Sequence, residues 1–225
     1  MSGRITEGAR HALLVATTNR GKLAELRALL ADLPVDVISI AEAGAASLVV
    51  EEDGDTFEAN ATKKAKAYAR ATMMLTLADD SGLEVDALGG LPGVRSARYA
   101  SENATDAENN AALLAALEPF GTERGERGFP ARFRCVLALH DPFGDDTTLV
   151  DGRCEGAIVG SARGAGGFGY DPLFLVGGGE KTMAELSSEE KNARSHRAQA
   201  FSKLKPLLEK RIFVRDEAIR RILDV

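Results

Sequence analysis

Residues 73–82 read Met-Met-Leu-Thr-Leu-Ala-Asp-Asp-Ser-Gly, an apolar run that meets two consecutive carboxylates. The apolar part has the length of a buried strand, and Asp79 and Asp80 stand where that strand is predicted to end. Ser81-Gly82 is predicted to form the turn that follows. Successive side chains of a strand point to opposite faces, so only one aspartate is expected to face a cleft. A charge at the end of a buried strand usually has a partner, which indicates a metal site or a base, although capping of the turn explains the pair equally well in isolation.

Apolar runs of strand length alternate with helical patterns along the rest of the chain. The predicted strands cover residues 12–16, 35–40, 75–78, 83–85, 132–139, 147–159 and 170–176. One predicted helix follows Asn19, and a second covers residues 57–71. A third opens at Thr105 with Glu108 in a capping box, and a fourth runs from Ser187 or Ser188 to about Lys210. This order predicts an α/β fold in which a mixed, twisted sheet carries helices on its faces and two lobes enclose an active-site cleft. We expect residues 1–10 to form a flexible tail and residues 11–225 to form a single two-lobed domain.

The composition argues against several classes of function. Of 225 residues, 44% are hydrophobic and 28% are charged, which is enough apolar material for a full core. The net charge of −6 provides no global positive field, so polymeric nucleic acid is not an expected partner. No apolar run reaches the length that spans a bilayer and no signal-peptide core opens the chain, so a cytoplasmic protein without membrane contact is expected. Cys135 and Cys154 lack metal-ligand spacing and are predicted to be buried thiols.

A second polar cluster, Thr17-Thr18-Asn19-Arg20-Gly21-Lys22, joins the first predicted strand to a helix. Backbone N–H groups and the positive end of the helix dipole then point into the crevice beyond the strand, which makes an anion site. Gly21 allows close approach of the backbone, and Lys22 adds a positive charge in the first helical turn. Taken alone, a capping role for Asn19 with a solvated Lys22 explains the cluster at least as well.

The segment Glu51-Glu52-Asp53-Gly54 precedes the lysine-bearing helix predicted at 57–71. Magnesium takes hard carboxylate oxygens and keeps several waters while it bridges substrate phosphates, so two carboxylates from separate segments suffice. We predict Glu51, in preference to its neighbour, and Asp80 as that pair. Lys64 is then placed to reach the phosphates. Acidic residues ahead of a helix are also common surface features.

Five ordered motifs resemble those of the inosine triphosphate pyrophosphatase family. They are Thr-x-Asn-x-x-Lys at 17–22, Asp-Asp-Ser-Gly-Leu at 79–83, Leu-Gly-Gly-Leu-Pro-Gly-Val-x-Ser-Ala-Arg at 88–98, Gly-Phe-Gly-Tyr-Asp-Pro at 167–172 and Ser-His-Arg at 195–197. The resemblance runs from about residue 12 to about residue 209. It implies a homodimeric, magnesium-dependent enzyme that cleaves a purine nucleoside triphosphate between its α and β phosphates. The favoured substrates would carry hypoxanthine or xanthine, namely ITP, dITP and XTP.

The resemblance also implies a role for each matching residue. Asp80 would accept a proton from water and, with Glu51, would bind the metal. The phosphates would be held by Thr17, Thr18, Asn19, Arg20, Gly21, Lys22 and Lys64. Ser81 would contact the substrate, and the base pocket would consist of Phe168, Gly169, Tyr170, Asp171, Lys191, His196 and Arg197. In one departure from the family, Ala59 stands where members often carry an acid, so any contact made by that acid must be absent or replaced.

The chemistry of these residue types agrees with a purine pocket. Phe168 follows a glycine run and can lie flat against a base, although a core phenylalanine is the simpler interpretation without its neighbours. Lys191, His196 and Arg197 gather hydrogen-bond donors near one helix face. Donors favour the 6-oxo group of hypoxanthine and xanthine over the 6-amino group of adenine.

Two other functions fit part of the pattern. One is a non-catalytic sensor that binds purine nucleotides, and the other is a pyrophosphatase for modified pyrimidine nucleotides. The acids Glu51, Asp79 and Asp80 argue against a pure sensor, and the purine-pocket motif at 167–172 argues against the pyrimidine enzyme. The products formed from ITP with magnesium would distinguish these functions.

Overall fold

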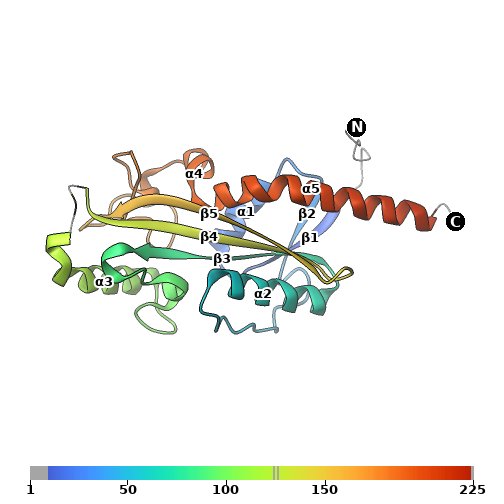
Figure 1. Ribbon diagram of the computed structural model, residues 1–225, viewed down its shortest axis with the longest axis horizontal. Helices are drawn as coiled ribbons and strands as arrows, with labels where there is room; N and C mark the ends of the chain where they lie inside the picture. The colour runs from blue at the N-terminus through green and yellow to red at the C-terminus, as the bar shows by residue number, and fades with distance from the viewer. Residues whose placement is uncertain (1–9, 124, 126, 224–225) are drawn as a thin grey trace.

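The computed structural model describes residues 10–123, 125 and 127–223, and it has a mixed six-stranded sheet at its centre (Figure 1). The strands are β1 His11–Ala16, β2 Val35–Ser39, β3 Leu75–Val85, β4 Phe129–Asp141, β5 Asp146–Ile158 and β6 Phe174–Val176. Their order across the sheet is β2-β1-β3-β4-β5-β6. β1 pairs in parallel with β2 and β3, and the remaining pairs are antiparallel. The predicted α/β class with a mixed sheet is therefore confirmed.

Helices cover both faces of the sheet. They are α1 Arg20–Leu30, α2 Phe57–Thr72, α3 Asp106–Leu117, α4 Ser188–Arg194 and α5 His196–Leu223. Figure 1 shows α1 and α5 on one face, with α2 and α3 on the other. The predicted capping box opens α3, where Thr105 accepts from the Glu108 backbone and Glu108 accepts from the Thr105 backbone.

The apolar core consists of three clusters, and β3 contributes to all of them. Leu77 packs in the cluster beneath α1 and α5, and Ala78 packs beneath α2. Leu83 belongs to the third cluster, which includes residues of α3. Adjacent residues of β3 thus face opposite sides of the sheet, as the period of a strand requires. One continuous strand connects the two halves of the molecule.

The strand that contains the two aspartates does not end where the sequence predicted. β3 continues through Asp79 and Asp80 without a turn at Ser81-Gly82, because β4 pairs with it from Thr76 to Val85 and satisfies its backbone groups. Gly82 has a different role. A Cβ at this position would lie 2.4 Å from the carbonyl oxygen of Gly93, so only glycine lets the following segment approach so closely.

The C-terminal helical region also differs from its prediction. A single helix was expected to about Lys210, whereas α4 ends at Arg194 and α5 begins after an extended Ser195. The Ser195 N–H donates to the Lys191 carbonyl at 2.8 Å, and the Ser195 hydroxyl accepts from the Ala198 N–H at 3.1 Å, so Ser195 both ends α4 and caps α5.

Helix α5 extends beyond the predicted end because its added turns have partners. Ile212 is buried in the core, and the guanidinium groups of Arg211 and Arg215 contact Asp141 at the end of β4. The predicted N-terminal tail lies mostly outside the described residues. Its last residue, Arg10, donates to Asp36 at 2.6 Å.

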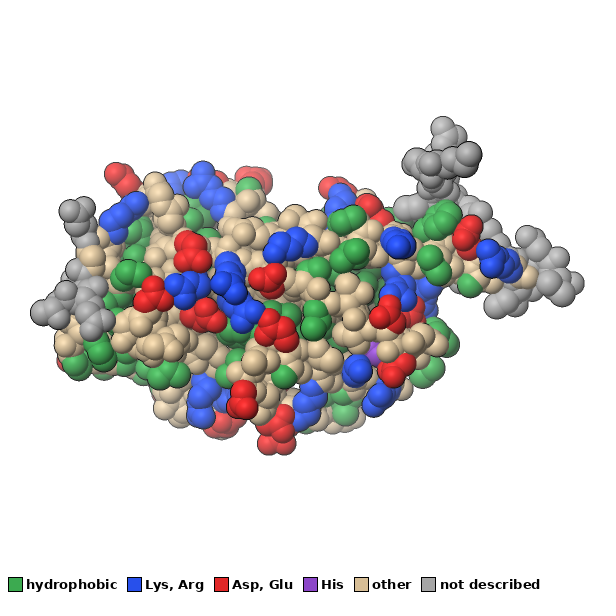
Figure 2. Space-filling view, viewed as in Figure 1, with side chains coloured by type: hydrophobic (Ala, Val, Ile, Leu, Met, Phe, Trp, Pro, Cys, Tyr) green, Lys and Arg blue, Asp and Glu red, His purple; other side chains and the backbone are tan. Residues whose placement is uncertain are grey.

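The surface of the face shown in Figure 2 carries basic and acidic side chains interspersed with one another, in keeping with the modest net charge of −6. In the described part of the chain, no helix has both the length and the apolar composition needed to cross a membrane.

Candidate active site

Two adjoining cavities lie beside the carboxyl end of β1. The first, here called the aromatic cavity, is lined by Phe133, Phe168, Tyr170 and His196 together with polar neighbours. The second, here called the polar cavity, is lined by Thr17, Thr18, Glu52, Lys64, Asp80 and others. The two cavities share the lining residues Asn19, Lys22, Ser81 and Ala97. A ligand with one apolar and one highly charged end could therefore span both.

The β1–α1 connection forms the boundary between the cavities. β1 lies between β2 and β3, and the crevice at such a point of a parallel sheet is a common ligand site. Asn19 caps α1 by accepting the Lys22 N–H at 3.0 Å. Capping and an anion site are thus compatible. Gly21 is placed under the Phe168 ring, and Arg20 is exposed and lines neither cavity.

One lysine and two carboxylates, Lys64, Glu52 and Asp80, line the polar cavity. Lys64 Nζ lies 2.9 Å from Glu52 Oε2, and Asp80 Oδ2 is buried without a hydrogen-bond partner among the described residues. Burial raises the pKa of Asp80 to about 7, and the charges of Lys64 and Lys22 act in the opposite direction. Burial likewise acts to raise the pKa of Glu52, but the charges of Lys64 and Lys22, together with hydrogen bonds to Lys64 and Asp80, hold that pKa below its ordinary value.

The structure places Glu52, and not the predicted Glu51, in the lining of the polar cavity. Glu51 is exposed and lines neither cavity. In an extended segment adjacent side chains point in opposite directions, so only one of two consecutive glutamates can face the cavity. Arg98 fixes which one, because its guanidinium donates to the Glu52 carbonyl at 2.8 Å. Ala59 is exposed on α2 and lines neither cavity.

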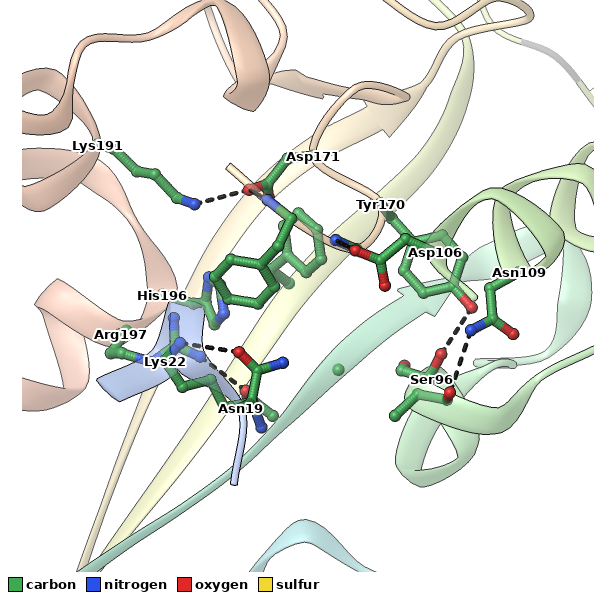
Figure 3. Close-up of a pocket in the computed structure, with 16 residues that line it drawn as sticks. Asn19, Lys22, Ser96, Asp106, Asn109, Tyr170, Asp171, Lys191, His196 and Arg197 are labelled. Atoms are coloured by element: carbon green, nitrogen blue, oxygen red, sulfur yellow. Dashed lines mark hydrogen bonds and ion pairs between the residues drawn. The ribbon is translucent and has the colours of Figure 1, made fainter. Parts of the chain in front are cut away.

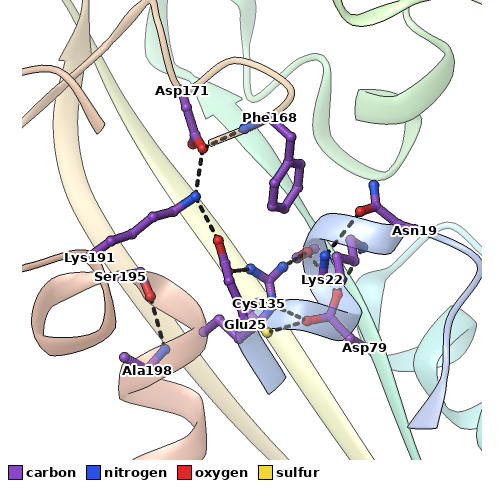
Figure 4. Close-up of polar contacts among 12 residues, drawn as sticks. Asn19, Lys22, Glu25, Asp79, Cys135, Phe168, Asp171, Lys191, Ser195 and Ala198 are labelled. Carbon is purple, nitrogen blue, oxygen red and sulfur yellow. Dashed lines mark hydrogen bonds and ion pairs between the residues drawn. The ribbon is translucent and has the colours of Figure 1, made fainter. Parts of the chain in front are cut away.

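Asp79 faces the other side of β3 and forms a buried network with α1 and α5 (Figure 4). Its side chain is fully buried and lies 2.8 Å from Lys22 Nζ and 2.7 Å from Arg197 Nε. It also accepts from Ser81 at 2.8 Å and from the Cys135 thiol at 3.2 Å. Although burial acts against the charge, Arg197 and Lys22 hold the pKa of Asp79 well below its ordinary value.

Arg197 is a buried cross-link, and the sequence did not predict this role. Its side chain is 1% exposed, and its guanidinium also contacts Glu25 and donates to the Ser81 hydroxyl at 2.9 Å. Glu25 in turn lies 2.6 Å from Lys191. Glu25 was missed, although its place one turn after Lys22 on α1 could have indicated a shared face. Arg197 lines the aromatic cavity, and direct contact between its remaining N–H groups and a base stays a prediction.

The aromatic cavity brings together the residues predicted for the base pocket (Figure 3). Asp171 accepts from the Phe168 N–H at 2.9 Å and from Lys191 at 2.6 Å, which holds the loop at 167–171. The ammonium of Lys191 lies 4.8 Å from the centroid of the Phe168 ring. His196 stacks on Phe133 with ring centroids 4.9 Å apart, and burial keeps its pKa well below the ordinary value, so the imidazole is neutral.

Several lining residues came from segments to which sequence reasoning gave no role. Ser96, Ala97, Asp106, Asn109 and Phe133 all line the aromatic cavity. Ser96 lies in the 3₁₀ segment Gly93–Arg98, and its carbonyl accepts from the buried Tyr170 hydroxyl at 2.8 Å. The motif at 88–98 was recognisable in the sequence, but its function depends on this long-range contact.

These features define an α/β protein with a two-part cleft, apolar at one end and lined by lysines and paired carboxylates at the other. The chain belongs to the Ham1 family, whose model matches residues 13–207. This confirms the resemblance found in the sequence.

Relatives and solved structures resemble most of the chain. It is 50% identical to a dITP/XTP pyrophosphatase of Bacillus subtilis, covering 87% of this chain and 96% of the relative. It is 53% identical to a dITP/XTP pyrophosphatase of Geobacter sulfurreducens, covering 86% and 94%. The structure of a HAM1 protein from Coxiella burnetii matches with a TM-score of 0.78 and 42% identity, covering 89% of this chain and 99% of that one.

Proposed function

We propose that this protein is a pyrophosphatase that hydrolyses ITP, dITP and XTP to the nucleoside monophosphate and pyrophosphate. The observation that carries the proposal is the junction of the two cavities at Asn19, Lys22 and Ser81. A purine fits between aromatic walls at one end, and a polyphosphate fits beside Lys64 and Asp80 at the other. The relatives named dITP/XTP pyrophosphatase support the same substrates.

Asp80 is the proposed proton acceptor for the attacking water. A general base works best when its pKa lies near the operating pH, and burial raises the pKa of Asp80 to about 7. The water oxygen would bond to the α phosphorus while its proton passes to the Asp80 carboxylate. The bond between the α phosphorus and the oxygen that bridges to the β phosphate would break, and pyrophosphate would leave with that oxygen, its charge facing Lys64.

Asp80 and Glu52 fit a divalent cation such as Mg²⁺. The Oδ2 atom of Asp80 is a buried oxygen without a partner, and both carboxylates line the polar cavity. Among the described residues no group of three or more His, Cys, Asp or Glu side chains could enclose a metal, which suits an ion that keeps waters and bridges to phosphates. When bound, the ion would neutralise phosphate charge and lower the pKa of water.

The two adjacent glutamates provide a matched test of the metal site. Glu52→Gln is expected to raise the Mg²⁺ concentration for half-maximal ITP hydrolysis by about 10-fold or more, because even outer partners of a metal site contribute that much. Glu51→Gln should leave it within about 2-fold, since Glu51 is exposed. A Mg²⁺ titration of both variants decides between them, and a larger effect at Glu51 would contradict the assignment.

Adjacent lysines on α2 test the phosphate site in the same way. Lys64→Ala should weaken binding of inorganic tripolyphosphate by about 10-fold or more, because this ligand loses a charge-assisted hydrogen bond to Lys64. The affinity for IMP should change little, because IMP lacks the phosphates that Lys64 is proposed to contact. Lys63→Ala is the control, since Lys63 pairs with the exposed Asp53 and lines neither cavity. Calorimetric titration measures both affinities, and equal weakening of the two ligands would remove Lys64 from the phosphate site.

We also infer a homodimer, which the family resemblance supports. Size-exclusion chromatography with light scattering should give about twice the chain mass of 23.8 kDa.

The cleavage position is tested by the products. The protein is incubated with Mg²⁺ and ITP, and the nucleotides are separated by chromatography. IMP with pyrophosphate is the expected result, whereas IDP with phosphate would contradict the proposed cleavage. Binding of ITP without turnover would instead favour the purine nucleotide sensor.

A further inference from the structure

The loop that carries Phe168 is held from the far side of the aromatic cavity by two side chains of α3. Asp106 Oδ2 accepts the Gly169 N–H at 2.7 Å, and Asn110 Nδ2 donates to the Gly169 carbonyl at 3.0 Å. Both polar groups of one peptide residue are thus bound by side chains about 60 positions earlier in the chain. We infer that this pair, here called the α3 latch, positions Phe168 for base binding and so sets the affinity for the base. This inference rests on the proposed function.

The backbone of this loop requires external support. Gly167 and Gly169 flank Phe168 with φ of +75° and +62°, a conformation that glycine adopts without steric cost. Glycine is also flexible, so these two residues do not by themselves keep the loop in this conformation. Among the described residues, the N–H and carbonyl of Gly169 have the latch side chains as their partners. The other end of the loop is held separately, by Asp171 and Lys191.

The latch side chains belong to a well-fixed helix. The capping box of Thr105 and Glu108 defines the first turn of α3. Asn109 ties that turn to the core because its amide donates to the Ala97 carbonyl at 3.1 Å and accepts the Ala100 N–H at 2.9 Å. Figure 3 shows Asp106 and Asn109 approaching the cavity from the side opposite Lys191. The latch therefore connects the loop to a well-fixed helix that packs in the same apolar cluster as Tyr170.

The position of Phe168 has a direct effect on the cavity. The Phe168 ring packs against Gly21, and a Cβ atom added at residue 21 would lie only 2.4 Å from the Cδ1 atom of that ring. A purine that enters the aromatic cavity must pack against this ring, so a loop that moves freely would have to be ordered when the base binds. That ordering lowers affinity for any ligand with a base. A ligand without a base should not be affected.

The test compares ligands that share only one end of the substrate. In Asp106→Ala/Asn110→Ala we expect the KM for ITP and the Kd for IMP to rise about 10-fold or more, from two lost hydrogen bonds. The Kd for inorganic tripolyphosphate should stay within about 2-fold, and kcat at saturating ITP should change much less than KM. Asp106→Asn should restore most of the affinity of an Asp106→Ala variant, because an amide oxygen can accept the same N–H.

Asn103→Ala is the control, because Asn103 lies just before α3, is exposed and lines neither cavity. Thermal unfolding checks that the variants fold, and the single Asn110→Ala variant, expected to show a smaller rise in KM, replaces the double variant if that one unfolds. Unchanged ITP and IMP affinities, or an equal loss for tripolyphosphate, would overturn the latch. If wild-type protein does not hydrolyse ITP, the proposed function fails instead.

Discussion

Asp80→Asn is expected to lower kcat for ITP by about 10²- to 10⁴-fold, the usual cost of losing a positioned general base. The loss should be larger still if the same carboxylate also binds the metal. The fold should survive. Burial and the neighbouring Glu52 and Asp79 carboxylates raise the pKa of Asp80, which means that its ionised form is unfavourable in the folded protein. A neutral side chain of the same shape removes that penalty.

The measurement is steady-state ITP hydrolysis together with urea denaturation of the same preparation. A variant that keeps near wild-type kcat would show that Asp80 is not the proton acceptor. A variant that loses activity together with its stability would show that the carboxylate supports the fold.

Asp79→Asn should mainly lower the stability of the fold, whereas the same change at the adjacent Asp80 should mainly lower kcat. Its carboxylate is buried between Lys22 and Arg197, so its removal leaves the Lys22 ammonium without its ion-pair partner and the buried Arg197 guanidinium with Glu25 as its remaining carboxylate. Breaking a buried pair in this way costs about 3 to 5 kcal/mol in the free energy of unfolding. Urea denaturation at neutral pH measures that free energy, and a loss below about 1 kcal/mol would contradict the structural role.

The stabilising contribution of Asp79 should also depend on pH. The pKa of Asp79 is lowered in the folded protein, whereas the pKa of an aspartate in an unfolded chain is about 3.9. As the pH falls, the unfolded chain therefore binds the proton first. The contribution is therefore present above the unfolded pKa and is lost as the pH falls through the lower folded pKa. Asp79→Asn should lack this component of acid unfolding.

The contrast between the two aspartates shows where sequence reasoning succeeded and where it did not. The strand period correctly separated them onto two faces, but it could not say which face holds the polar cavity. That depends on what packs against each face. Asp79 shares its face with Leu77 beneath α1 and α5, and Asp80 shares its face with Ala78 beneath α2. The predicted strand end was wrong because the pairing partner β4 is remote in sequence.

The candidate site was predictable where local pattern carried the signal. The strand–turn–helix at Thr17 to Lys22 and the loop at 167–171 both border the cavities, although Arg20 lines neither, and each is a short motif with glycine at a required place. The choice between Glu51 and Glu52 could not be made from the sequence because the two residues are identical in type, and only the contacts of Arg98 and Lys64 determine which one faces the cavity.

By itself, the sequence determined the alternation of strand and helical segments, the α/β class, the capping box of α3, and the family. These follow from periodicity, turn residues and ordered motifs, which act over a few residues along the chain. Only the tertiary structure decided that Arg197 is a buried cross-link to Asp79, 118 residues away, and that α3 holds Gly169 through Asp106, 63 residues away. Such contacts depend on how the elements pack around the sheet, which local pattern does not encode.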